Sequence, residues 1–181
     1  MPITLLSTQT IGATLGDNAV NAGVKAAIIG VLLIALFLIL LYRLPGLVAT
    51  VSLGIFISII LALFKLMPVT LTAAGIAGFI ISIGIAVDAN VLIFERVKEE
   101  MRSGKTIKES ISSGFSRAWF SIRDSNISNF ITAVILFWFG TSLIQGFAFT
   151  LGMGVIVSMF SAIVITRIFL GALLFIGEGL I

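Results

Sequence analysis

Five mainly apolar stretches dominate the pattern of hydrophobic and polar positions along the chain. A helix needs about 20 apolar residues to cross a bilayer core. The pattern predicts such helices over residues 24–41, 47–64, 71–94, 123–140 and 147–170. A longer polar segment, 95–122, separates the third from the fourth, and residues 1–21 form a polar, Gly-containing start. We therefore expect an all-α membrane protein with a tail over residues 1–21 and a transmembrane domain over residues 22–181.

Composition supports this class and excludes others. Hydrophobic residues make up 59% of the 181 positions and charged residues only 10%, whereas soluble domains carry about 25% charged residues. The mean hydropathy is +1.25. The sequence contains no Cys and no His, so it lacks thiol ligands and the commonest general base. We predict no cofactor, no metal site and no enzyme activity of the soluble type.

The distribution of basic residues predicts the orientation. Of the eleven Lys and Arg, seven lie between Arg96 and Arg123. If the N-terminus lies outside, nine of the eleven fall on cytoplasmic segments, and only Lys25 and Lys65 face out. The positive-inside rule therefore favours N-out and C-in, and the net charge of +3 indicates topology rather than nucleic-acid binding. Because no signal precedes this N-out helix, we expect that an N-terminal part was removed or is encoded separately.

The predicted cytoplasmic segment, residues 95–122, has helical features of its own. The third helix is expected to continue into it and to end at Ser103-Gly104. Thr106 and Glu109 then fit a capping box, and apolar residues recur every three or four positions, at Ile107, Ile111, Phe115, Trp119 and Ile122. This spacing predicts an amphipathic helix lying at the cytoplasmic membrane surface. A simple connector is the alternative.

Asp88 is the one carboxylate in the interior of a predicted span, since Asp124 lies at the very start of the fourth. It lies seven residues before Glu95, or about 10 Å at roughly 1.5 Å per residue. An ionised Asp inside a bilayer costs at least about 2.5–3.5 kcal/mol, so it should face protein or water. Such a carboxylate can exchange a proton with a water-filled half-channel. The alternative is a structural Asp that pairs with a helix end or an Arg.

Small residues recur at every fourth position of the same helix, at Ala74, Gly78, Ser82 and Ala86. Stripes of this kind let membrane helices pack closely. Gly84 lies on the face that carries Asp88, and we expect it to permit close helix contact there. The alternative for all these positions is that small residues are simply frequent in membrane helices.

A second polar cluster opens the fourth predicted span: Arg123-Asp124-Ser125-Asn126-Ile127-Ser128-Asn129. One interpretation is that Asp124 or Ser125 caps the helix, where an acid also suits the helix dipole. The other is that Arg123, Asp124 and Asn126, together with Asn90, form a polar network in the membrane or with a partner subunit.

These motifs resemble the bacterial SecD family. The most specific run is Gly84-Ile85-Ala86-Val87-Asp88-Ala89-Asn90-Val91-Leu92-Ile93-Phe94-Glu95-Arg96-Val97-Lys98-Glu99-Glu100. Residues 123–126, 146–152 and the start of the chain, 10–16, are also similar, in the same order. The family usually carries two threonines where this chain has Ser128-Asn129. It also has a first membrane helix and a large extracytoplasmic domain that these 181 residues do not include.

The resemblance implies an RND-like half-bundle in the bacterial cytoplasmic membrane. It implies a partner, SecF, beside the SecYEG translocon, and use of the proton-motive force to pull exported polypeptides outward, with Asp88 as the proton-handling carboxylate. Sodium is the alternative coupling ion. The alternative functions are a proton-coupled RND transporter of small molecules or lipids, and a structural subunit in which Asp88 only pairs.

Overall fold

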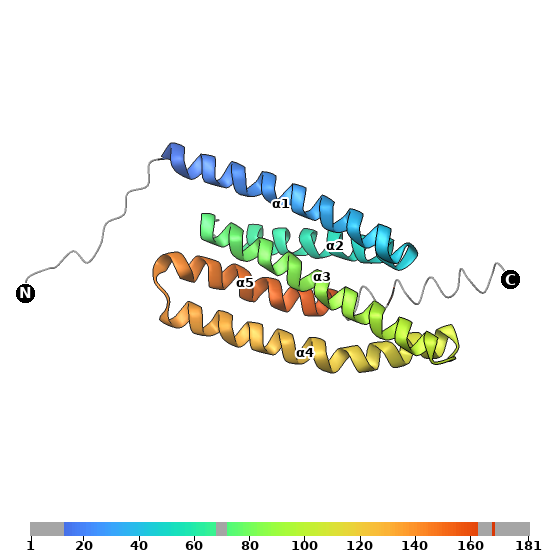
Figure 1. Cartoon of the computed structure of the whole chain (residues 1–181). Helices are drawn as coiled ribbons and strands as arrows, with labels where there is room; N and C mark the ends of the chain where they lie inside the picture. Colours follow the sequence, from blue (N-terminus) through green and yellow to red (C-terminus); the bar gives the residue numbers. More distant parts are fainter. Residues whose placement is uncertain (1–12, 68–71, 163–167, 169–181) are drawn as a thin grey trace, which may run out of the picture.

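Five α-helices make up most of the chain. The computed structural model describes residues 13–67, 72–162 and 168. Within them the helices are α1 (Ala13–Tyr42), α2 (Leu44–Leu66), α3 (Ala73–Arg102), α4 (Ile107–Phe139) and α5 (Ser142–Phe160). They run alternately up and down, so that α1 meets α2 and α3 meets α4 at the same end of the bundle (Figure 1).

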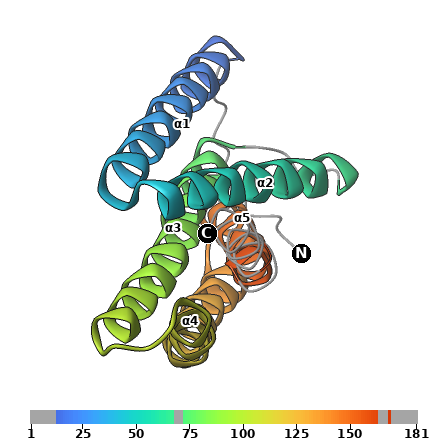
Figure 2. The same cartoon turned by 90° about the vertical axis from the view of Figure 1, so that its right-hand side faces the viewer.

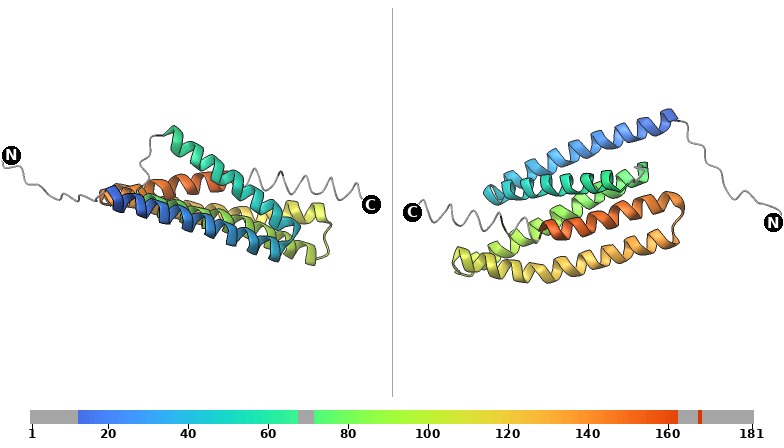
Figure 3. Two further views of the ribbon diagram at one scale, coloured as in Figure 1. Left: turned by 90° about the horizontal axis from the view of Figure 1, so that it is seen from above. Right: turned by 180° about the vertical axis from the view of Figure 1, so that it is seen from behind.

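The central helix is α3, which packs against each of the other four. Seen along the bundle, α1 and α2 lie on one side and α4 and α5 on the other (Figure 2). The views from above and behind show that α4 and α5 run antiparallel and that α1 and α2 separate toward the N-terminal end of α1 (Figure 3). Any site on α3 is therefore flanked by two helical hairpins.

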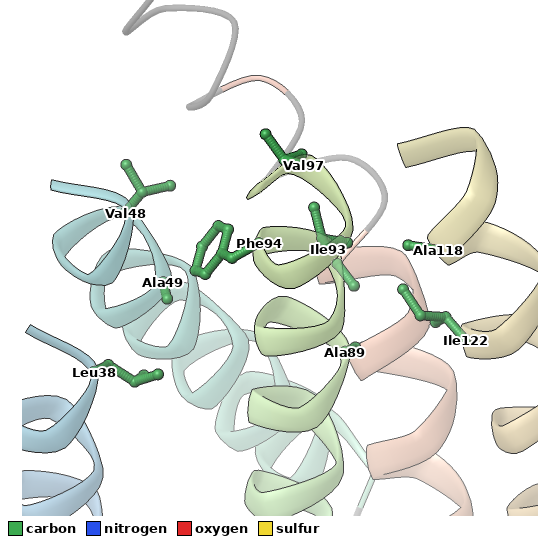
Figure 4. Close-up of a cluster of buried hydrophobic side chains, with 10 residues drawn as sticks. Leu38, Val48, Ala49, Ala89, Ile93, Phe94, Val97, Ala118 and Ile122 are labelled. Atoms are coloured by element: carbon green, nitrogen blue, oxygen red, sulfur yellow. The ribbon is translucent and has the colours of Figure 1, made fainter. Parts of the chain in front are cut away.

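Two hydrophobic clusters hold the bundle together. The first joins α1, α2, α3 and α4 near the α1–α2 connection (Figure 4) and consists of Leu38, Val48, Ala49, Ala89, Ile93, Phe94, Val97, Ala118, Ile122 and Ala162. The second lies further along α2 and α3 and consists of Leu53, Phe56, Ile60, Phe64, Ile83, Ala86 and Val157. Burial in these clusters, rather than helix propensity, sets the relative positions of the helices.

The break between α1 and α2 is a single residue. Arg43 has a φ of 53°, a left-handed conformation that interrupts the helix. Pro45 then lies in the first turn of α2, where its missing N–H leaves no hydrogen bond unmade. A methyl group on Gly46 would collide with the carbonyl oxygen of Leu38. The chain therefore reverses within one residue, and glycine is required at position 46 by the close packing of the two helices.

Helix α3 is longer than a membrane is thick. Its 30 residues extend over about 45 Å, against roughly 30 Å for the hydrocarbon core, and the hairpin that it forms with α4 projects beyond α1 and α2 (Figure 1). The Tyr42 hydroxyl donates a hydrogen bond to Glu95 Oε1 at 3.1 Å, and its ring lies 5.6 Å from that of Phe94. As predicted, α3 continues past Glu95, and it ends beside Gly104, whose φ is 88°.

Helix α4 differs from the prediction. It runs without a break from Ile107 to Phe139. The prediction of a separate amphipathic helix that ends before residue 123 is therefore wrong. The reason is that no proline interrupts these 33 residues. Asp124 and Ser125 consequently lie in mid-helix, and the hypothesis that one of them caps a helix is also wrong.

The capping box at the start of α4 is confirmed. The Glu109 N–H donates to Thr106 Oγ1 at 3.4 Å, and the Thr106 N–H donates to Glu109 Oε2 at 3.2 Å. The Thr106 hydroxyl donates to the same carboxylate at 2.9 Å. These hydrogen bonds, that of the hydroxyl first, lower the pKa of Glu109, because they stabilise the charged form.

Small residues form the closest contacts of α4 with α3, while Ile111 and Phe115 of the predicted stripe are partly buried against the same cluster. Ser110, Gly114 and Ala118 are buried, and a methyl group on Gly114 would lie 2.7 Å from the backbone nitrogen of Val97. Of the predicted stripe, Ile122 alone is buried. Small side chains occupy this face because they let the two helix backbones approach closely.

Four described helices are long and apolar enough to cross a membrane: α1 from Asn18, α2, α3 and α5. The chain is therefore a multi-pass, all-helical membrane protein. Helix α1 begins at Ala13, so the predicted tail over residues 1–21 is helical from that point; no proline lies between Ala13 and residue 21 to stop the helix. The predicted end of the fifth span, residue 170, lies outside the described residues.

Candidate functional site

Asp88 lies in a small groove between α3 and α4. The groove has a volume of about 90 Å³ and combines residues of α3, including Asp88, Ala89 and Leu92, with polar residues of α4. The α4 side is formed by Ser121, Ser125, Asn126 and Asn129 together with Ile122. The Asp88 side chain is exposed at the edge of this groove. A carboxylate thus meets uncharged hydroxyl and amide groups.

Helical spacing places these polar groups opposite Asp88. Ser121, Ser125 and Asn129 recur at every fourth position of α4, so they share one helix face. Within the described part of the chain, the Asp88 carboxylate forms no hydrogen bond or ion pair. Since an unpaired charge is costly inside a bilayer, this carboxylate needs polar surroundings when it is ionised.

The alignment of α3 with α4 brings the two sides of the groove together. It is fixed by ion pairs at the projecting end of the hairpin that these two helices form. Glu100 is only 5% exposed and accepts hydrogen bonds from Arg117 Nη1 at 2.6 Å and from Lys105 Nζ at 2.5 Å. The hydrogen bond with Glu100 raises the pKa of Arg117. These ion pairs connect α3, the turn and α4. Sequence analysis missed them because Glu100 and Arg117 lie 17 residues apart, beyond any local pattern.

Arg123 and Asp124 do not line the groove. Their side chains pair with each other at 2.8 Å. Asp124 is largely exposed and Arg123 is half-buried, and the Arg123 guanidinium lies 5.4 Å from the centre of the Phe120 ring. The predicted polar cluster is therefore divided between two faces of α4.

Asn126 turns inward and joins α4 to α5. It is only 4% exposed; its amide nitrogen donates to the Ile122 carbonyl at 2.8 Å, and Ser158 of α5 donates to its Oδ1 at 3.4 Å. Asn90, two residues after Asp88, is buried as well and lies on the opposite side of α3. Asn126 thus borders the groove, whereas Asn90 belongs to the interior.

The predicted small-residue face of α3 lies against α5. Gly78, Ser82 and Ala86 are buried, and a methyl group on Gly78 would lie 2.5 Å from the carbonyl oxygen of Phe147. Ser82 is in direct contact with Gly154. Gly84 differs, because a methyl group placed there would meet no atom within 4 Å.

Hydroxyl groups inside the apolar helices add contacts that sequence analysis did not assign. Thr150 of α5 donates to the carbonyl oxygen of Gly75 in α3 at 2.9 Å, and the hydroxyls of Ser52 and Ser161 lie 3.2 Å apart, joining α2 to the end of α5. The presence of a Ser or Thr within an apolar span is the feature of the sequence that could have indicated these contacts, since membrane helices often associate through such groups.

Among the described residues, no three His, Cys, Asp or Glu side chains gather to hold a metal ion.

The match to a known protein family covers nearly the whole chain. Residues 2–175 match the family described as "Protein export membrane protein SecD/SecF, C-terminal". The chain belongs to the SecD/SecF protein-export family. Its Asp88 groove is therefore a feature of the C-terminal membrane region of such a protein.

Two SecD proteins show how much of a relative this region represents. The chain is 56% identical over 178 residues to the protein translocase subunit SecD of Thermobaculum terrenum, an alignment that covers 96% of this chain and 35% of the relative. It is 52% identical over 182 residues to that of Dehalococcoides mccartyi, covering 98% and 40%. The chain thus spans less than half the length of these relatives.

Solved structures show the same helix arrangement. The crystal structure of SecDF, a translocon-associated membrane protein from Thermus thermophilus, superposes with a TM-score of 0.89 at 41% identity, covering 93% of this chain and 24% of that one. SecDF in its super-membrane-facing form gives a TM-score of 0.83 at 42% identity, covering 90% and 22%. The predicted all-helical family fold is confirmed.

Proposed function

We propose that this chain is the membrane part of a SecD-type accessory subunit of the Sec translocase. In this function it uses the proton-motive force to assist the export of polypeptides across the bacterial cytoplasmic membrane, and it performs no enzymatic reaction. Membership in the SecD/SecF family and the names of the SecD relatives support the proposal. The association of SecDF with the translocon indicates the partner complex, SecYEG.

The position of Asp88 is the observation on which the coupling step depends. Its carboxylate is exposed on an otherwise apolar span, beside a groove lined by hydroxyls and amides. Moving one charge across 100 mV releases about 2.3 kcal/mol. Protonation removes the cost of keeping the charge in the membrane, so a proton that binds and leaves Asp88 can drive a change in how α3 packs with its neighbours.

SecF is the partner that we assign to the open face of α3. Ala77, Ile81 and Asp88 are exposed on this face, and nothing lies within 4 Å of a methyl group at Gly84. A helix of another subunit can therefore approach closely here and provide polar groups for Asp88. Such an interface removes the carboxylate from lipid.

We propose further that α4 also crosses the membrane, which gives five spans together with α1, α2, α3 and α5. Its polar groove side is turned toward α3 and SecF, while Ile131, Ile135 and Trp138, which are 52%, 52% and 77% exposed, face lipid. Together with an N-out and C-in orientation, this places the basic hairpin between α3 and α4 in the cytoplasm, as the positive-inside rule favours.

The decisive experiment measures export into membrane vesicles under an imposed proton gradient, with the chain assembled with SecF and the translocon. Asp88→Asn keeps the shape of the side chain and removes its charge. We expect it to abolish the gradient-dependent part of export while ATP-driven initiation persists. The matched control is Glu99→Gln, which removes a largely exposed carboxylate near the projecting end of the same helix.

Unchanged gradient-dependent export in Asp88→Asn vesicles would contradict the proposal. The carboxylate would then have a structural role, or the chain would belong to a transporter of small molecules or lipids. Equal losses in both variants would instead trace the defect to helix α3 as a whole rather than to proton exchange at Asp88.

A further inference from the structure

A larger and entirely different cavity lies on the other side of α3, between α1 and α2. It has a volume of about 450 Å³, and every side chain that lines it is apolar. One wall is α1 between Val20 and Leu32, and the other wall and the floor are formed by α2 and α3 through Ile57, Leu61, Phe64, Ile76, Phe79 and Ile83. We call this cavity the α1–α2 slot. It follows from the separation of α1 from α2 toward the N-terminal end of α1 (Figure 3).

Helix α1 is attached to α3 along the slot and beyond it. Gly23, between the slot residues Val20 and Val24, lies so close to α3 that a methyl group there would be 2.9 Å from Ile76 Cγ2. Beyond the slot, toward the C-terminal end of α1, Leu38 is completely buried in the cluster shared with α2 and α3. Because α1 contacts α3 at both places, the slot is not the result of a loosely attached helix.

The shape of the slot suits a hydrocarbon chain. Val20 and Leu32 lie about 18 Å apart along α1 at roughly 1.5 Å per residue, so the volume of about 450 Å³ belongs to an elongated groove. No hydroxyl, amide or charged side chain lines it. An acyl chain is elongated and apolar in the same way.

Two cations lie beside the half of the slot that is nearer the N-terminal end of α1, where a lipid headgroup would lie. Lys25 and Lys65 directly follow the slot residues Val24 and Phe64. Both are exposed, and neither pairs with an acid among the described residues. From Lys25 to Tyr42, α1 extends over about 26 Å, close to the roughly 30 Å of the hydrocarbon core. Lys25 therefore lies at headgroup level while the slot continues into the hydrocarbon.

We propose that the α1–α2 slot binds one acyl chain of an anionic phospholipid, whose phosphate pairs with Lys25 or Lys65. The bound acyl chain lies between α1 and α2 and contacts both helices where they do not contact each other. The proposal concerns a different face of α3 from Asp88 and does not depend on the export function.

The test fills the slot with a larger protein side chain and measures whether the lipid is still retained. The full chain is reconstituted into nanodiscs of equal parts phosphatidylglycerol and phosphatidylethanolamine, released into detergent, and analysed by native mass spectrometry. We expect one retained phosphatidylglycerol per chain. Ala27→Phe places a ring in the slot and should reduce retention at least five-fold. Ala26→Phe, at the neighbouring exposed position outside the lining, should retain the lipid, and Lys25→Gln with Lys65→Gln should remove the preference for phosphatidylglycerol.

Equal retention by Ala27→Phe and Ala26→Phe would overturn the proposal. A second measurement avoids any folding defect of the ring variant. With Trp119 and Trp138 replaced by Phe, a tryptophan at Leu61 in the slot is compared with one at Leu36, which is similarly exposed but outside the lining. Phosphatidylglycerol brominated on its acyl chains quenches the fluorescence of a nearby tryptophan. After dilution with unbrominated lipid, this quenching should last longer for Leu61→Trp than for Leu36→Trp. Identical recovery of both signals would also overturn it.

Discussion

Thr150 illustrates how single polar groups contribute to this bundle. Its side chain is only 1% exposed, and its hydroxyl lies within hydrogen-bond distance of the Gly75 carbonyl in α3, at 2.9 Å, and of the Phe147 carbonyl in its own helix, at 3.0 Å. A hydroxyl has one proton to donate. The bond between helices is therefore shared with one that α5 could form alone, which limits its net contribution.

Replacing this hydroxyl should have a measurable but modest effect. Thr150→Val keeps the shape and should lower the free energy of unfolding by about 0.5–1.5 kcal/mol, the range of hydrogen bonds between membrane helices. Equilibrium unfolding in mixed detergent micelles measures it. The control is Thr132→Val, an exposed position whose hydroxyl bonds only within α4, to the Ser128 carbonyl at 2.9 Å. An equal loss in the control would contradict a role in joining α3 to α5.

Between elements, the closest packing is that of α3 on α5. The atoms that a side chain at Gly78 would meet include the carbonyl oxygen of Phe147 and the backbone nitrogen of Leu151, at 2.5 and 3.3 Å. Backbone atoms of a packed helix cannot rotate aside as a flexible side chain can. The glycine is thus needed for space, although it weakens α3 as an isolated helix.

Two alanine variants in α3 separate packing from helix propensity. Gly84→Ala should leave the isolated chain unchanged or stabilise it by up to about 1 kcal/mol, because alanine favours the helix and the position is open. Gly78→Ala should instead destabilise it by about 1–3 kcal/mol, because overpacking outweighs this gain. Unfolding in mixed micelles compares them. Equal changes in the free energy of unfolding would mean that α3 and α5 can move apart to accommodate the methyl group without a loss of stability.

At the scale of the whole molecule, the two ends of the bundle differ in charge. The end where α3 meets α4 carries most of the Lys and Arg residues, and several are paired with the glutamates of α3. The opposite end, where α4 meets α5, has no charged residue between Asp124 and Arg167. This asymmetry is the basis for the proposed orientation in the membrane.

Labelling of single cysteines tests this orientation. The chain has no native cysteine, so Ser103→Cys and Thr141→Cys, both at exposed positions at opposite ends, have no background. In intact cells, a membrane-impermeant maleimide should modify Thr141→Cys, and it should reach Ser103→Cys only after permeabilisation. The reverse pattern would place the hairpin outside and contradict the proposed orientation.

The sequence by itself determined the features that depend on neighbouring residues. The apolar spans of α1, α2, α3 and α5, the end of α3 before Gly104 and the capping box of Thr106 and Glu109 all follow from hydropathy or hydrogen bonding within a few turns. The presence of a lone carboxylate, Asp88, on an apolar span is likewise visible without a structure.

Only the tertiary structure decided which faces meet. The buried face of α4 combines small residues such as Gly114 with Ile122 of the apolar stripe, because small side chains let the backbone of α4 approach α3 closely. The pairing of Glu100 with Arg117 and the grouping of Asp88 with Ser125 and Asn129 depend on the register between α3 and α4. That register results from contacts between segments far apart along the chain, for which no local pattern exists.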